Sequence, residues 1–496
     1  MKIAELKKSA VINVLGWLLP ALIFLVITPV MIDKLGVEGF GIVALIQIVT
    51  GYMSVLNFGF SEAIIKQVAE YRNKDLDHAM KVIWTGLILF IVFGVFGALL
   101  IYSLSDWLGL KILQVPDEQR IETALALKIA SVIFLLQMIA EFYRGSAIGC
   151  SRFDIPNICR IIRISSSGIL IIWVLQRGGG VVEIMMATLA GLIIGLVLNA
   201  VWMQRVLPMY FVSGGFKKIF SELFHFSKHV FFVRIAGMVS GKLSQFVLGI
   251  TSSIGNVAFY EVPTRAAELG SVILNRILQV LYPGFASMDR NNELDRIRMI
   301  FFSVLSIQLI VITPFFIMVI LEGPALLALW INEEFADHAS IIISIIAITY
   351  FISSLTNMPV FAAMGFNMPG IVSKYSIIRM SITLVIVYPL VTEYGLVGAA
   401  WSLLISELQA FALIYETSRR LFGINVYKVL FRPIAIHLII GTILYLLYEL
   451  VYRHSVIYSP LAVLFVGALH FFLAIISNTT SKDDNRRIMK LLFVWR

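Results

Sequence analysis

The chain has 496 residues, of which 59% are hydrophobic and only 14% charged. Soluble globular chains are nearer half apolar and a quarter charged, and a single soluble core stops growing near about 250–300 residues. This composition therefore excludes a soluble enzyme, a disordered chain and a secreted disulfide scaffold. The net charge of +9 suits cytoplasmic loops that face anionic lipid, and it does not imply nucleic acid.

Apolar runs long enough to cross a bilayer recur along the whole chain. The first run, 10–32, has the length of a membrane span and is predicted to be a retained helix, since a signal peptide has a shorter apolar run before its cleavage site. We predict an all-α polytopic membrane protein with fourteen transmembrane helices, at 10–32, 39–61, 82–104, 123–143, 161–177, 184–206, 229–251, 257–285, 301–322, 339–362, 376–393, 394–416, 433–452 and 460–477.

Basic residues fall mostly on one side of this predicted topology. With the N-terminus inside, the inside segments hold 29 of the 39 Lys and Arg side chains, and the outside segments hold five. Membrane proteins carry an excess of Lys and Arg in their cytoplasmic loops. The pattern therefore predicts that both termini are cytoplasmic.

One segment between the sixth and seventh spans is amphipathic without being long enough to cross. In 214–228, apolar residues recur at helical spacing, and Lys217 and Lys218 lie on the other face. This pattern is typical of a helix that lies in the membrane interface. The C-terminal tail repeats it with apolar residues around Leu491 and Trp495.

Short glycine-containing motifs suggest an internal repeat. Gly36-Val-Glu-Gly-Phe-Gly precedes the second span, and Gly255-Asn-Val-Ala-Phe-Tyr stands at the start of the eighth. Repeated halves with a site between them are a transporter design. We predict two pseudo-symmetric six-helix lobes around a central cavity, with the chain divided into an N-terminal lobe (1–213), a linker helix (214–228), a C-terminal lobe (229–420) and two appended spans with a cytoplasmic tail (421–496).

Charges inside two neighbouring spans lie on one face of each helix. A charge at the bilayer centre costs roughly 2.5–3.5 kcal/mol on insertion scales, so such residues usually face a cavity or a partner. The charges of the eighth span fall within about an 80° arc, and Arg265 can pair with acidic neighbours three or four residues away. The two stripes consist of Arg234, Lys242 and Gln245 in the seventh span, and Glu261, Arg265, Glu268 and Arg276 in the eighth.

Other spans carry uncharged or paired polar faces. Gln47, Ser54 and Asn57 share one face of the second span, and Glu141 lies with Arg144 in the fourth. Cations neutralise phosphate, while amides and hydroxyls bind sugar hydroxyls. The cavity is therefore predicted to take an anionic, hydroxyl-rich substrate through Arg234, Lys242, Arg265 and Arg276. Glu261, Glu268 and Glu141 are candidates for coupling to an ion.

Motifs for catalysis and cofactor binding do not appear in the sequence. No phosphate-binding loop, dinucleotide fingerprint or serine-nucleophile motif is present. Cys150 and Cys159 have no nearby histidine, and His225 and His229 lack acidic support for a metal. We expect no enzymatic activity, no cofactor and no metal.

The run from Leu35 through Leu45, followed by Leu56-Asn-Phe-Gly-Phe-Ser-Glu-Ala, resembles the first conserved block of polysaccharide-biosynthesis flippases. These belong to the multidrug/oligosaccharidyl-lipid/polysaccharide exporter superfamily. The run from Gly255 to Pro283 looks like the matching block of the second half. The family usually has an acidic residue where Asn57 stands here.

The resemblance implies a transporter of O-antigen or exopolysaccharide repeat units in the bacterial inner membrane. It would flip an undecaprenyl-diphosphate-linked oligosaccharide from the cytoplasmic to the periplasmic leaflet by alternating access. A polysaccharide polymerase and chain-length proteins would be its partners, along with membrane lipids. The alternatives are a peptidoglycan lipid-precursor flippase, a multidrug or cation antiporter, and a membrane-embedded polysaccharide polymerase or ligase.

Overall fold

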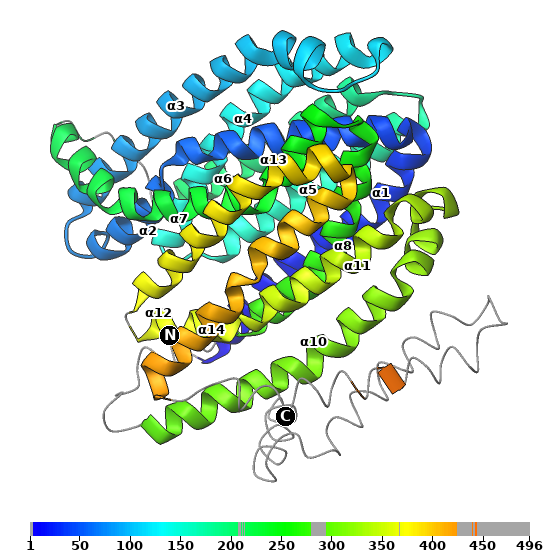
Figure 1. The fold of residues 1–496 in the computed structure, drawn as a ribbon. Helices are drawn as coiled ribbons and strands as arrows, with labels where there is room; N and C mark the ends of the chain where they lie inside the picture. Colours follow the sequence, from blue (N-terminus) through cyan, green and yellow to red (C-terminus); the bar gives the residue numbers. More distant parts are fainter. Residues whose placement is uncertain are drawn as a thin grey trace. The chain divides into compact units, whose positions relative to one another are not determined.

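The computed structural model describes residues 3–206, 210, 212, 214–278, 294–366, 368–423, 439, 442 and 443. All regular secondary structure in these residues is helical, and they contain no strand (Figure 1). The predicted all-α class is thus confirmed. Apart from residues 439, 442 and 443, the predicted spans 433–452 and 460–477 and the amphipathic tail lie outside the described residues.

Two compact units divide the chain, Met1–Ala258 and Phe259–Arg496. The helices of the first unit are α1 (Ile3–Met53), α2 (Phe60–Tyr71), α3 (Leu76–Trp107), α4 (Arg120–Gly149), α5 (Asp154–Gln176), α6 (Val181–Val206) and α7 (Phe216–Thr251). The boundary falls within α8 (Ile254–Leu278), and the second unit continues with α10 (Leu294–Trp330), α11 (Glu333–Leu355), α12 (Asn357–Gly365), α13 (Pro369–Glu407) and α14 (Gln409–Phe422).

Two of the longest helices are each broken by a glycine. Gly36 in α1 has φ 74° and ψ 172°, and Gly395 in α13 has φ 54° and ψ −128°. Glycine adopts positive φ without the steric cost that a side chain brings. Gly36 lies in the motif between the first two predicted spans, and Gly395 lies at the start of the predicted span 394–416, next to the end of the span before it.

The second predicted span, 39–61, ends earlier than expected. The α-helix stops at Met53, a short 3-10 turn follows at Ser54–Asn57, and Phe58 and Gly59 are left-handed. The next residues therefore belong to a separate helix, α2. Apolar composition alone could not show this break, because Phe58 and Phe60 are as hydrophobic as the residues of the span.

Eight stretches of the described chain are long and apolar enough to cross a membrane. Two of them, Leu19–Asn57 and Pro369–Phe422, contain the glycine breaks. α7 contributes a shorter apolar stretch, Ile235–Thr251, and α8 carries three charges in its middle. The chain is a multi-pass membrane protein, and the count of fourteen helices stays a prediction.

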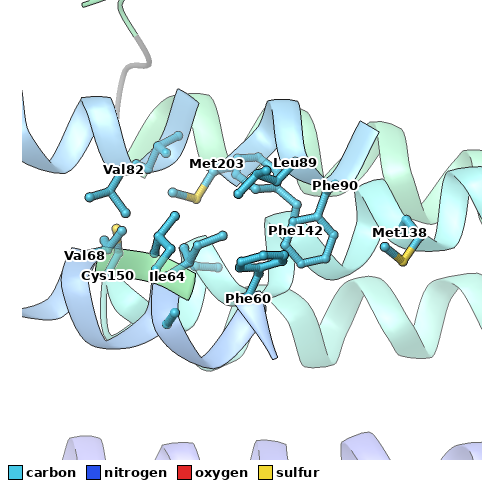
Figure 2. Close-up of a cluster of buried hydrophobic side chains, with 14 of the residues drawn as sticks. Phe60, Ile64, Val68, Val82, Leu89, Phe90, Met138, Phe142, Cys150 and Met203 are labelled. Carbon is cyan, nitrogen blue, oxygen red and sulfur yellow. The ribbon is translucent and has the colours of Figure 1, made fainter. Parts of the chain in front are cut away.

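Large apolar side chains of α2, α3 and α4 fill the core of the first unit. Figure 2 shows Phe60, Phe90 and Phe142 in one cluster, with the rings of Phe90 and Phe142 6.2 Å apart. Gly86 allows this close packing, since a Cβ there would lie 2.5 Å from Ile64 Cδ1. The same cluster includes two residues from the start of α7, Ile219 and Leu223.

The amphipathic segment 214–228 forms the first turns of α7 and continues into the rest of that helix without a break. Ile219 and Leu223 are buried in the first unit, whereas Phe216 and Phe224 are 45% and 47% exposed. Their rings stack on Phe220, with centroids 6.3 and 5.9 Å apart. α7 therefore packs with the first unit, although the sequence placed it in the C-terminal lobe.

The exposed stack of phenylalanines flanked by Lys217 and Lys218 is expected to contact the membrane interface. Reversing both charges, Lys217→Glu with Lys218→Glu, should weaken headgroup contact by about 1 kcal/mol per charge without abolishing transport. A spin label at Phe224 should report a lipid environment that becomes more aqueous in this variant. The arginine variant of both positions should match the wild type, and a label in water throughout would contradict the assignment.

The predicted inside loop between the fourth and fifth spans is shorter in the structure, and basic residues at its two ends lie within helices. α4 extends to Gly149 and α5 begins at Asp154, so only four residues separate them. Arg144, Arg160 and Arg163 are thereby placed on helices that cross or enter the membrane. The sequence did not predict these longer helices, because Arg and Ser lower the mean hydropathy near the end of a helix although the helix itself continues.

Candidate functional site

The charges of α8 form an ion-paired group within their own helix. Arg265 Nε donates to Glu261 Oε1 at 2.7 Å, and Arg265 Nη1 lies 3.8 Å from Glu268 Oε2. Glu261 is only 5% exposed. The predicted pairing at spacings of three and four residues is present, so two carboxylates offset the charge of Arg265.

Hydrogen bonds tie this part of α8 to α10 and α11. Ser354 Oγ of α11 lies 3.0 Å from Ser271 Oγ of α8. The amide of Gln308, from α10, donates to the backbone oxygen of Ser354. Both contacts lie inside the second unit: the first holds α8 against α11, and the second joins α10 to α11.

A second ion pair crosses the glycine break of α13. Arg379 Nη2 lies 2.8 Å from Glu407 Oε2, and the side chain of Glu407 is only 2% exposed. The two residues belong to consecutive predicted spans, 376–393 and 394–416. Opposite charges on these adjacent predicted spans are the sequence signal for this pair.

In the first unit, the second half of α1 is buried at every position from 39 to 50 except Gln47. Gly51, one turn further, is exposed as well. This half of α1 packs on α7, because the Tyr52 and Phe246 rings meet edge to face at 5.7 Å and a Cβ at Gly249 would lie 2.5 Å from Leu45 Cδ1. Gln47 is thus an exposed amide in a run that is otherwise buried against α7 and its neighbours.

α7 has open positions of its own one or two turns away from that contact. A Cβ added at Gly237 or Gly241 would meet no atom within 4 Å. Lys242, beside Gly241, is half-buried, and Gln245 is fully buried one turn further along. We call Gln47, Gly51, Gly237, Gly241 and Lys242 the open polar positions of the first unit.

Asn57 and Ser61, two polar residues of the predicted second span, are buried. Asn57 is 3% exposed, and its Oδ1 accepts from the Ser61 backbone N–H at 3.4 Å. Ser61 Oγ in turn accepts from Arg144 Nη2 at 3.1 Å, and Arg144 Nε donates to Glu141 Oε2 at 2.7 Å. Asn57 and Glu141 thus belong to a network that joins α2 to α4, apart from Gln47.

Three predicted site residues cannot be placed beyond their backbone. The side chains of Ser54, Arg234 and Arg276 lie outside the described part of the structure. The backbone of Arg234 is helical in α7, about 40° around the helix from Gly237 and Gly241 on average at 100° per residue. Arg234 therefore shares a helical face with the open glycines.

The open polar positions combine the ammonium group of a lysine, the amide of a glutamine and the backbone of three glycines. A lysine ammonium binds phosphate as a point charge, and glycine lets a ligand approach a helix backbone closely. Gln47 can both donate to and accept from a hydroxyl. This arrangement can hold an anionic, hydroxylated molecule, and it contains no nucleophile with an adjacent base among the described side chains.

Comparison with known proteins identifies relatives of this chain. Residues 6–289 match the model of a family described as "Polysaccharide biosynthesis protein". The chain is 25% identical over 410 residues to a protein of Shigella flexneri named "Putative O-antigen transporter". That match covers 80% of this chain and 94% of the relative.

Two solved structures share the fold. The first is the lipid II flippase MurJ in an inward closed conformation, with a TM-score of 0.72 at 14% identity, covering 95% of this chain and 99% of that one. The second is an inward-facing multidrug resistance MATE family transporter of the MOP superfamily, with a TM-score of 0.71 at 14% identity, covering 84% of this chain and 98% of the other. At these identities the likeness concerns the fold alone.

Proposed function

This chain belongs to the polysaccharide biosynthesis protein family, and we propose on that premise that it flips a lipid-linked oligosaccharide. The substrate is an undecaprenyl-diphosphate-linked repeat unit, carried from the cytoplasmic to the periplasmic leaflet by alternating access of two lobes. The observation that carries the proposal is Lys242, a cation beside the open Gly241 on a helix of a multi-pass membrane protein. The relationship to the O-antigen transporter relative supports it.

The open polar positions suit the two chemical parts of this substrate. Lys242, together with Arg234 on the same helix, takes the diphosphate, since burying a cation in the membrane costs free energy that an anion can offset. The sugars lie against Gly237 and Gly241, and Gln47 exchanges hydrogen bonds with their hydroxyls. Arg276 is a third cation for the phosphates as the substrate enters.

The ion-paired groups have a different part in the proposal. Arg265 organises Glu261 and Glu268 within α8 rather than binding the substrate directly, because both carboxylates offset its charge. Glu261 and Glu268 in the second unit, and Glu141 in the first, are the carboxylates available for coupling to an ion.

The proposed topology has fourteen spans with both termini in the cytoplasm of a bacterium. The uneven distribution of basic residues supports this orientation. A reporter fused after Arg453 is expected to be periplasmic, and one fused at the C-terminus cytoplasmic. A periplasmic C-terminus would show that the number of spans is odd and would overturn the topology.

Analysis of lipid-linked intermediates tests the function most directly. A strain lacking the protein should accumulate undecaprenyl-diphosphate-linked repeat units on the cytoplasmic side and lose surface polysaccharide. Accumulated peptidoglycan precursor would favour that flippase instead, and altered drug tolerance without accumulation would favour an antiporter. Unpolymerised units accumulating on the periplasmic side would point to a polymerase or ligase.

A further inference from the structure

Arg163 of α5 lies within the membrane-crossing part of the first unit. α5 has 23 residues and is one of the eight membrane-crossing stretches, and at 1.5 Å per residue Arg163 is about 14 Å from the first residue of the helix. Among the described residues, no side chain or backbone group forms a hydrogen bond or ion pair with the Arg163 guanidinium. A cation thus lies two residues inside the predicted apolar span 161–177, without a counter-charge from the described chain.

Close packing of α5 on α6 fixes the stem of this side chain. A Cβ added at Gly195 would lie 2.8 Å from Arg163 Cβ, and one added at Gly191 would lie 2.0 Å from Ser167 Oγ. Gly191 and Gly195 therefore let the two helices approach closely. The base of the arginine is held against α6, and the residue as a whole is partly exposed.

Acidic residues at the ends of these two helices are already engaged. Asp154 accepts from Arg152 at 2.9 and 2.8 Å. Glu183 Oε2 accepts from the backbone N–H of Gly180 at 2.8 Å. Neither carboxylate is in contact with Arg163, so the charge that compensates it has to come from outside these helices.

Two further polar groups lie on the same side of the α5 and α6 pair. Arg160 is three residues before Arg163 on α5. Asn199, one turn beyond Gly195 on α6, is 9% exposed, and its Oδ1 is buried with no hydrogen-bond donor among the described groups. Its Nδ2 already donates to the Gly195 backbone oxygen at 3.0 Å. An anionic ligand would compensate the charge of Arg163, whereas Asn199 Oδ1 is buried and out of its reach.

We propose that Arg163 and Arg160 bind the phosphate of an anionic phospholipid, phosphatidylglycerol, at the α5–α6 boundary on the side of Asp154. Guanidinium forms paired hydrogen bonds with phosphate oxygens, and basic pockets between transmembrane helices bind anionic headgroups. This site is separate from the open polar positions and does not depend on the proposed transport.

Thermal unfolding in bilayers of two compositions tests this site. Wild-type protein in nanodiscs of phosphatidylcholine should unfold at a higher temperature when phosphatidylglycerol is added, because a ligand that binds the folded state stabilises it. Arg163→Gln should lose this increase. In pure phosphatidylcholine the same variant should be at least as stable as the wild type, because it no longer buries an uncompensated charge.

Native mass spectrometry provides a second measurement with matched variants. Arg163→Gln should retain about fivefold less phosphatidylglycerol, equivalent to the roughly 1 kcal/mol that one cation contributes near an anionic surface. Arg160→Gln should show a smaller loss. Arg177→Gln, at the other end of α5, where the guanidinium lies 4.1 Å from the Trp173 ring, should retain wild-type levels.

Three results would overturn the proposal. Equal responses of wild type and Arg163→Gln to phosphatidylglycerol would place the lipid elsewhere. Stabilisation by undecaprenyl diphosphate but not by phosphatidylglycerol would assign the guanidinium to the carrier lipid instead. If Arg163→Gln fails to accumulate, Arg160→Gln is measured in its place. An Arg160→Gln variant that binds as much phosphatidylglycerol as the wild type would then overturn the proposal.

Discussion

Replacing Lys242 with glutamate, together with Arg234→Glu, is expected to abolish export of the lipid-linked oligosaccharide while the protein still inserts at normal levels. A hydrogen bond to a charged group contributes about 1.5–3 kcal/mol, which corresponds to roughly ten- to 150-fold in affinity. Charge reversal adds repulsion of the diphosphate to that loss. Surface polysaccharide and accumulated intermediates in a complemented deletion strain are the measurements.

Control variants separate the effect of the Lys242 charge from effects of misfolding and of filling the space beside Lys242. Lys242→Arg should preserve export, since it keeps the cation. A Cβ at position 241 meets no atom within 4 Å, so Gly241→Phe should insert normally. Its ring should reduce export by filling the space beside Lys242. Gly241→Ala should reduce export only slightly. Normal surface polysaccharide in the double glutamate variant would remove the phosphate-binding role, and normal export by Gly241→Phe would show that this position faces lipid.

Breaking the Arg379–Glu407 pair should give the largest loss of stability. Removing one partner of a buried ion pair typically costs about 3–5 kcal/mol, because the other charge stays buried without compensation. Glu407 is 2% exposed, so Arg379→Met should destabilise the second unit by about that amount. The loss would appear as a lower unfolding temperature of the purified protein in detergent.

The double substitution Arg379→Met with Glu407→Leu is the decisive comparison. Replacing both partners of a buried pair with apolar residues is often neutral or stabilising, so the double variant should recover most of the stability lost by the single one. A double-mutant cycle isolates this coupling. If the two single losses simply add, the pair contributes no coupling, and the role of Glu407 in joining the halves of α13 is wrong.

Sequence alone was sufficient for those features that depend on composition and local spacing. The all-α membrane class follows from apolar runs of span length, whatever their neighbours are. The pairing of Arg265 with Glu261 and Glu268 follows from helical geometry within one helix. The helix break at Gly36 agrees with the glycine motif that the sequence places between the first two apolar runs.

Tertiary structure decided which polar residues on one face of the predicted second span are exposed and which are buried. Gln47 and Asn57 share a predicted face, yet Gln47 is exposed while Asn57 is buried against Ser61, because a turn separates α1 from α2. The pairing of Arg379 with Glu407, and the absence of a described partner for Arg163, depend on contacts between helices. Periodicity shows which residues share a side of a helix, whereas only packing against other helices determines what that side meets.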